Sequence, residues 1–234
     1  MRMFLRPLLT ALVISSAFAA EAAPASATAP AGAAERPSPR AWLEAKVKAA
    51  HKLSQRKVEP DTPAEKQWQA DGKALIDDII DWDELTRRAL GSNWRKRSKP
   101  EQKRFAGLLR KLIESSYRSR LRFAVREKPD RPKDVEVDWL EEDVKPEKAH
   151  LVAKVNAGED SVLLGFKLRW DDRWRVYDVA IDDLSTVRTY RSNFRKIIDK
   201  EGWKGLIARL ESKIADIEAG RAEFARPALE DKEG

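Results

Sequence analysis

The chain has 234 residues, of which 42% are hydrophobic and 36% are charged, and its formal net charge at pH 7 is +7. This length suits one medium domain or two small ones, with enough apolar residues to bury a core beneath a charged surface. Because the chain has no cysteine, a disulfide scaffold, a cysteine-ligated zinc site and a thiol nucleophile are all excluded.

The N-terminal segment has the composition of an export signal followed by a linker. Two arginines precede an apolar run from Leu8 to Phe18, which ends in the small-x-small pattern Ala17-Phe18-Ala19. We therefore predict a cleaved signal peptide over residues 1–19 and an exported protein. Residues 20–39 are rich in Ala, Pro and Ser, and this composition predicts a disordered linker.

Helical periodicity dominates the next 90 residues, before any strand is expected. The first predicted helix spans residues 40–57, and the last and longest of this series ends before Pro129. Two start signals combine a capping side chain with a proline: Thr62 with Pro63, and Ser98 with Pro100. Asp81-Trp82-Asp83-Glu84 starts a short helix that ends at Gly91.

Four strands are predicted next, joined by connections too short to hold a helix, so the sheet should be antiparallel. The last two form a hairpin over residues 162–181, with a turn at Asp171-Asp172. In the returning strand, period-two alternation places Tyr177, Val179 and Ile181 on one face, with Trp174 and Val176 on the other. Helices before and after one antiparallel sheet make the predicted class α+β.

Two amphipathic helices, interrupted at Gly202, complete the predicted domain. We assign residues 40–218 to a single domain. Residues 219–234 are charged and contain Pro227, and they are predicted to form a flexible tail.

Several short motifs together resemble the MlaC (toluene-tolerance) family. In the C-terminal half they are Trp174-Arg175-Val176-Tyr177-Asp178-Val179, Leu184-Ser185 and Tyr190-Arg191-Ser192-Asn193-Phe194. Upstream, Leu90-Gly91-Ser92-Asn93-Trp94 and Glu101-Gln102-Lys103-Arg104-Phe105 are similar to the family's L-G-x-(Y/H)-W and E-Q-R-x-x-F patterns. The resemblance covers roughly residues 79–210.

This resemblance implies a non-catalytic, periplasmic phospholipid-binding protein without a cofactor. The implied fold is a four-stranded antiparallel sheet covered by a helical layer, NTF2-like, with a lipid cavity between sheet and helices. The implied role is a shuttle that carries glycerophospholipid between the outer and inner membranes. Its implied partners are an inner-membrane ABC transporter complex with a lipid-binding ring and an outer-membrane lipoprotein complex, and not nucleic acid.

Under the resemblance, a set of apolar and aromatic residues becomes candidates for lining the lipid cavity. The sequence alone favours an ordinary packed core for these residues, and both interpretations stay open. The candidates are Leu75, Ile79, Leu90, Trp94, Phe105, Leu108, Leu109, Leu112, Tyr117, Phe166, Leu168, Tyr177, Val179, Tyr190 and Phe194.

Three catalytic interpretations are less well supported. Asp77-Asp78-Ile79-Ile80-Asp81 has the D-D-x-x-D spacing of a magnesium-diphosphate site, but no second metal motif follows. The only two histidines, His51 and His150, fall in different predicted elements. In an NTF2-like enzyme an Asp base and a Tyr donor would share a pocket. Tyr177 and Asp178 are adjacent on one strand, so their side chains point to opposite faces. Asp178 is more simply a capping residue or an ion-pair partner of an arginine such as Arg191.

Basic residues suggest a second class of function. Arg95-Lys96-Arg97, Lys99 and the arginines between residues 118 and 126 form either a solvated helix surface or a docking surface for anionic headgroups or acidic proteins. The alternative to a lipid carrier is therefore an exported adaptor that binds a membrane complex and carries no lipid.

Overall fold

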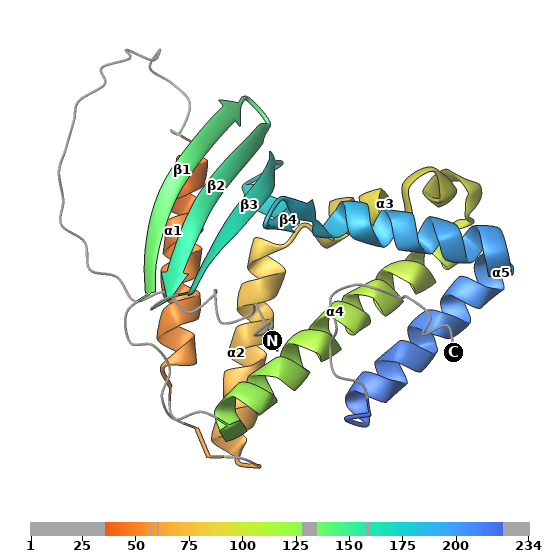
Figure 1. Cartoon of the computed structure of the whole chain (residues 1–234), viewed down its shortest axis with the longest axis horizontal. Coiled ribbons are helices and arrows are strands. Elements are labelled where there is room, and N and C mark those ends of the chain that lie inside the picture. The colour runs from red at the N-terminus through yellow and green to blue at the C-terminus, as the bar shows by residue number, and fades with distance from the viewer. Residues whose placement is uncertain (1–35, 57, 60, 128–134, 158–159, 222–234) are drawn as a thin grey trace, which may run out of the picture.

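The computed structural model in Figure 1 describes residues 36–221 except 57, 60, 128–134 and 158–159. The predicted signal peptide, most of the predicted linker and most of the predicted tail lie outside these residues. Within them, no helix has the length and apolar character needed to cross a membrane.

Five helices precede the sheet in the described residues. They are α1 (Pro39–Ser54), α2 (Pro63–Ile79), α3 (Trp82–Leu90), the short 3-10 helix η2 (Gly91–Lys96) and α4 (Lys99–Glu127). Of these, α2 and α4 begin directly after the predicted capping residues Thr62 and Ser98. Thr62 Oγ1 accepts a hydrogen bond from the Glu65 amide at 3.2 Å. Ser98 Oγ accepts one from the Glu101 amide, and the Glu101 carboxylate accepts in return from the Ser98 amide at 2.8 Å. These contacts satisfy donors that the first helical turn cannot pair internally.

Residues 36–39, which the sequence assigns to the linker, contact the domain instead. Arg36 donates to the Pro146 carbonyl oxygen at 2.6 Å and its guanidinium lies 5.0 Å from the Trp170 ring centroid. The Pro37 carbonyl accepts from Trp174 Nε1 at 2.8 Å, and Ser38 caps α1. Local composition missed this boundary because the contacts are made to strands more than 100 residues away.

The sheet is antiparallel throughout and its strands follow chain order, which confirms the α+β class. Its strands are β1 (Val135–Lys145), β2 (Lys148–Ala157), β3 (Asp160–Trp170), β4 (Trp174–Ile181) and β5 (Leu184–Ser185). The two-residue β5 is a fifth strand beyond the four predicted. It pairs with Ala180 and Ile181 immediately before α5.

A β-bulge in β4 overturns the predicted alternation of that strand. Leu168 pairs with Val176, but Lys167 pairs with Asp178, so Tyr177 is the extra residue. One inserted residue reverses the facing of everything beyond it. Trp174 and Val176 therefore share a face with Val179 and Ile181, and Tyr177 is separated from them.

The last helix, α5 (Thr186–Glu218), is bent at Gly202, as the sequence predicts. Gly202 has φ 74° and ψ −178°, a left-handed conformation that favours glycine. Figure 1 shows the two halves of α5 running in different directions.

The buried residues form two apolar clusters. The sheet cluster packs one face of β2, β3 and β4 against Leu43 of α1. The helix cluster is formed by α3, α4 and α5. In Figure 1, α1 lies behind the sheet, whereas α3, α4 and α5 lie beside it at the β4 side. The predicted single helical layer is thus divided, and Ile80 contacts both clusters.

Asp81 joins the two parts of the molecule. Its side chain is almost completely buried, with 1% of the residue exposed. Oδ1 caps α3 by accepting from the Glu84 amide at 3.0 Å, and Oδ2 accepts from Arg169 Nε and Nη2 at 2.9 and 2.7 Å. The Asp81 amide donates to the Val176 carbonyl at 2.8 Å. The hydrogen bond with Asp81 raises the pKa of Arg169.

We expect Asp81→Ala to lower the free energy of unfolding by about 2–3 kcal/mol, because it removes a helix cap and leaves Arg169 without its main partner. Urea denaturation at neutral pH measures this change. Asp83→Ala is the matched control, since Asp83 is exposed in the same helical turn. Equal losses of stability in the two variants would contradict the role given to Asp81.

Candidate functional site

The structure divides the candidate lipid-lining residues between the two clusters. One group belongs to the helix cluster or packs against it: Leu90, Trp94, Phe105, Leu108, Leu109, Leu112, Tyr190 and Phe194. A second group belongs to the sheet cluster or packs against it: Ile79, Phe166, Leu168 and Val179. Leu75 is half-buried on α2, Tyr177 is buried beneath Arg88, and the side chain of Tyr117 lies outside the described residues.

The centre of the helix cluster is closely packed, although Trp94, Leu108 and Trp203 at its margin are only partly buried. Phe105 and Leu109 are fully buried, and the Phe105 ring meets Phe194 edge to face with centroids 5.4 Å apart. Phe194 in turn stacks on Tyr190 at 5.3 Å. Interiors packed in this way leave little room for an added chain without displacement of side chains.

The sheet cluster is incompletely covered. Leu151 and Leu168 in its centre are fully buried, but a group of apolar side chains around them remains partly exposed. They come from β1, β3, β4 and the end of α2: Val137, Trp139, Val162, Val179, Ile181, Ile79 and Ile80. We call these residues the open apolar face. Contiguous apolar surface of this kind is a feature of binding sites for apolar ligands.

Most of the open apolar face was missed by the sequence analysis. Val162 and Ile181 have the strand periodicity of core residues, and nothing in the sequence shows that helices leave them partly uncovered. Ile80 looks like a helix-end residue, but it forms a parallel bridge to Val176.

A polar network lies next to Asp81, between α3 and β4. Glu84 is 8% exposed and accepts hydrogen bonds from Arg87 and Arg88 at 2.6–2.9 Å. Burial alone would raise the pKa of Glu84, but these two arginines outweigh it and hold the pKa below its ordinary value. The Arg88 guanidinium lies 4.4 Å from the centroid of the Tyr177 ring, and burial raises the pKa of the Tyr177 phenol.

A family model described as MlaC protein matches residues 47–212 of the chain. The chain belongs to the MlaC family. A search of curated proteins finds no match. Among solved structures, the chain is similar to one described as the phospholipid-binding protein from Ralstonia solanacearum in complex with a phospholipid. The identity is 23%, the TM-score is 0.59, and the match covers 74% of this chain and 97% of that one. At this identity the likeness shows a shared fold.

Two of the motifs that resemble the MlaC family contact each other. Gly91, with φ +60°, ends α3, and a Cβ atom there would lie 3.1 Å from Cδ of Arg191. Arg191 Nε donates to the Arg88 carbonyl at 2.8 Å and so satisfies the C-terminal end of α3. The L-G and Y-R motifs of this MlaC-family chain thus form one joint between α3 and α5.

The acidic D-D-x-x-D stretch is engaged by cations. Asp77 accepts from Arg110 at 2.6 Å and from Lys73 at 2.7 Å, and Asp78 pairs with Lys46 at 2.5 Å. Burial favours a higher pKa for Asp77, yet hydrogen bonds from Lys73 and Trp82 and the charge of Arg110 hold its pKa below the ordinary value. In the described part of the chain, no group of three metal-ligating side chains is positioned to hold an ion.

Asp178 caps α5 and does not face Tyr177. Its Oδ2 accepts from Ser185 Oγ at 2.7 Å and its Oδ1 from the Val187 amide at 3.0 Å, as the capping interpretation predicts. The alternative partner, Arg191, binds the Arg88 carbonyl instead. Tyr177 and Asp178 therefore lie against α3 and α5 respectively, an arrangement that separates the proposed base from the proposed donor.

We expect Glu84→Gln to lower the free energy of unfolding by about 1–2 kcal/mol at neutral pH, since it leaves the exposed Arg87 and the half-buried Arg88 without a carboxylate. The folded-state pKa of Glu84 lies below its ordinary value of 4.5. The stabilisation is therefore present above pH 4.5 and is lost as the pH falls through the folded-state pKa.

The measurement is urea denaturation of the parent and the variant across this pH range. The difference in unfolding free energy should shrink as the solution becomes more acidic. Glu141→Gln, an exposed position on β1, serves as control. A difference that does not vary with pH would contradict the assignment.

Proposed function

We propose that this protein is a periplasmic phospholipid carrier. The acyl chains of the bound phospholipid lie on the open apolar face, in a cavity between the sheet and the α1 and α2 helices. The observation that carries the proposal is the open apolar face itself, which lies on a fold shared with a phospholipid-binding protein in a chain of the MlaC family. Of the lipid-lining residues predicted from the sequence, the proposed site keeps Ile79, Phe166 and Val179. The partly exposed residues of the open apolar face complete it.

The energetics of lipid transfer explain why a carrier is needed. A diacyl lipid has roughly 30 tail carbons, and at about 0.8 kcal/mol for each, transfer into water costs on the order of 20 kcal/mol. If the apolar face buries the acyl chains with a free energy close to that of the membrane, the lipid can be both loaded and released. The proposed function is non-catalytic and needs no covalent step or cofactor.

The proposed setting is supported by the predicted signal peptide over residues 1–19 and by the family. We propose that the carrier moves glycerophospholipid between the outer and inner membranes, with an inner-membrane ABC transporter complex with a lipid-binding ring and an outer-membrane lipoprotein complex as partners. The phospholipid headgroup stays close to solvent in this arrangement.

Native mass spectrometry of protein purified from the periplasm without detergent tests the proposal directly. We expect a stoichiometric bound mass that yields phospholipid after organic extraction. A ligand-free mass that gains nothing on incubation with liposomes would overturn the carrier and favour an exported adaptor that carries no lipid.

A single substitution tests the location of the lipid. We expect Val179→Trp to remove most of the bound phospholipid, because the indole ring occupies space above Phe166, its cross-strand partner. The overpacking should reduce stability by no more than about 3 kcal/mol. Val144→Trp is the matched control, since Val144 is 49% exposed on β1. Equal lipid content in both folded variants would count against this site.

A further inference from the structure

A group of cations at the helical end of the molecule has no acidic partner within the described part of the chain. Arg95, Lys96, Lys99 and Lys103 are exposed, and no acidic side chain among the described residues pairs with them. They follow one another through η2 and the first turns of α4. All four fall between residues 95 and 103, so their charges add in this part of the chain.

Neighbouring arginines show what structural pairing looks like in this region. Arg97 lies 3.6 Å from Glu101 and its guanidinium stacks 5.0 Å from the Trp203 ring centroid. Arg104 bonds Glu211 of α5 at 2.8 Å. Arg97 and Arg104 thus link α4 or the turn before it to α5. The four cations form no such ion pair with an acidic side chain of the described residues.

Helix electrostatics do not account for Lys99, although Arg95 and Lys96 lie in the last turn of η2, where positive charge is favourable. The N-terminal end of a helix carries partial positive charge, and stability favours acidic residues there, as Glu101 illustrates. Lys99 in the first turn of α4 has the unfavourable sign. We therefore interpret the positive charge at the start of α4 as serving binding and not the stability of the fold.

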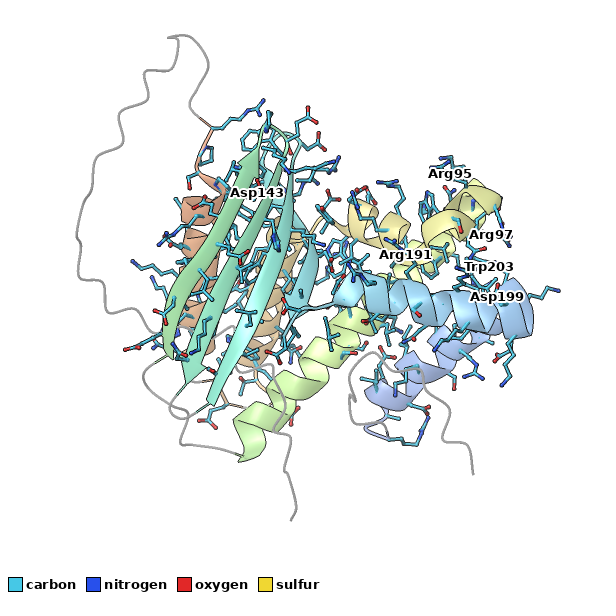
Figure 2. The ribbon with its side chains drawn as sticks, turned by 45° about the horizontal axis from the view of Figure 1, so that its top comes forward. Arg95, Arg97, Asp143, Arg191, Asp199 and Trp203 are labelled. Carbon is cyan, nitrogen blue, oxygen red and sulfur yellow. The ribbon has the colours of Figure 1, made fainter. Side chains whose placement is uncertain are left out.

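Arg191 adds a fifth cation from α5. Its Nε is fixed on the Arg88 carbonyl and its side-chain methylenes lie against Gly91, at the base of η2. Figure 2 shows Arg95, Arg97, Arg191 and Trp203 gathered at this end of the molecule. We call Arg95, Lys96, Lys99, Lys103 and Arg191 the basic pole. Trp94 and Trp203, both half-buried, flank it.

The free edge strand of the sheet, β1, has more acidic than basic residues. Five of the eleven residues of β1, the free edge of the sheet, are acidic: Glu136, Asp138, Glu141, Glu142 and Asp143. Asp143 lies far from the basic pole in Figure 2. This separation gives the protein a preferred orientation toward any charged surface.

We propose that the basic pole docks on the surface of an anionic lipid bilayer, with η2 and the start of α4 toward the membrane and β1 away from it. Exposed lysines and arginines on flexible stems suit a diffuse layer of anionic headgroups, and indole rings at the margin suit the depth of the headgroup region. The proposal concerns the outer surface and is independent of a lipid on the open apolar face.

The first test is co-sedimentation of the purified protein with vesicles. The probes are phosphatidylcholine vesicles with and without phosphatidylglycerol, at low salt and at about 0.5 M salt, where screening is strong. We expect binding to the anionic vesicles only, and loss of binding at high salt. Equal binding to both vesicle types, or no binding to the anionic ones, would overturn the proposal; the latter result would favour an acidic protein as the partner.

A charge-matched pair of variants locates the surface. The pole variant carries Gln at Arg95, Lys96, Lys99 and Lys103. The control variant carries Gln at exposed lysines elsewhere: Lys48, Lys52, Lys66 and Lys148. Both lose four charges, so a general effect of net charge would weaken them equally and overturn the proposal. We expect the pole variant to bind about tenfold or more weakly and the control variant to bind like the parent.

A second measurement does not depend on how the pole variant folds. The chain has no cysteine, so single-cysteine variants accept one environment-sensitive fluorophore each. We expect a spectral shift with anionic vesicles for a label at Ser92→Cys in η2 and none for a label at Glu142→Cys on β1. Equal responses at the two positions, or a response at Glu142 alone, would overturn the proposed orientation.

Discussion

The arrangement of this molecule depends on one buried carboxylate. Asp81 caps α3, receives two hydrogen bonds from Arg169 on β3, and holds the chain against β4 through its own amide. It is the point where α2 ends on the sheet and α3 begins the helix cluster. Ile80 next to it contacts both clusters, so these two residues help to position the helices on the sheet, as Asp178 does where it accepts from the Val187 amide of α5.

This joint explains how one domain holds two apolar clusters with different properties. The helix cluster is closed by α5, whose aromatic side chains surround Phe105. The sheet cluster has α1 and the end of α2 on it and keeps apolar side chains partly exposed. A lipid carrier needs one part that keeps its shape and another part whose apolar surface is covered by the bound lipid. In the function we propose, the helix cluster provides the first and the open apolar face the second.

Much of the fold was predictable because its signals are local. Thr62, Ser98 and Gly202 act on their own helices, and each marks a boundary or a bend where the sequence places it. The bulge at Tyr177 was not predictable from alternation, since one extra residue leaves the pattern of apolar residues almost unchanged.

The candidate site was predictable only in part, for a related reason. Phe105 and Phe166 have the same periodic spacing that any core residue has, and only tertiary packing places one in a closed cluster and the other below an open face. The contact of Arg169 with Asp81 spans 88 positions, and no local pattern reports it. The MlaC-family motifs indicated which segments matter, and the structure shows that two of them meet at Gly91 and Arg191.

The bend at Gly202 has a consequence for the size of the domain. A straight helix of 33 residues would be about 50 Å long and would extend well beyond the elements that it covers. The bend turns the second half back toward α4, so that Phe194 before it and Trp203 after it both reach the ring of Phe105. The bend at Gly202 thereby lets the two halves of α5 pack against Phe105 of α4 from two directions, and α3 completes the helix cluster.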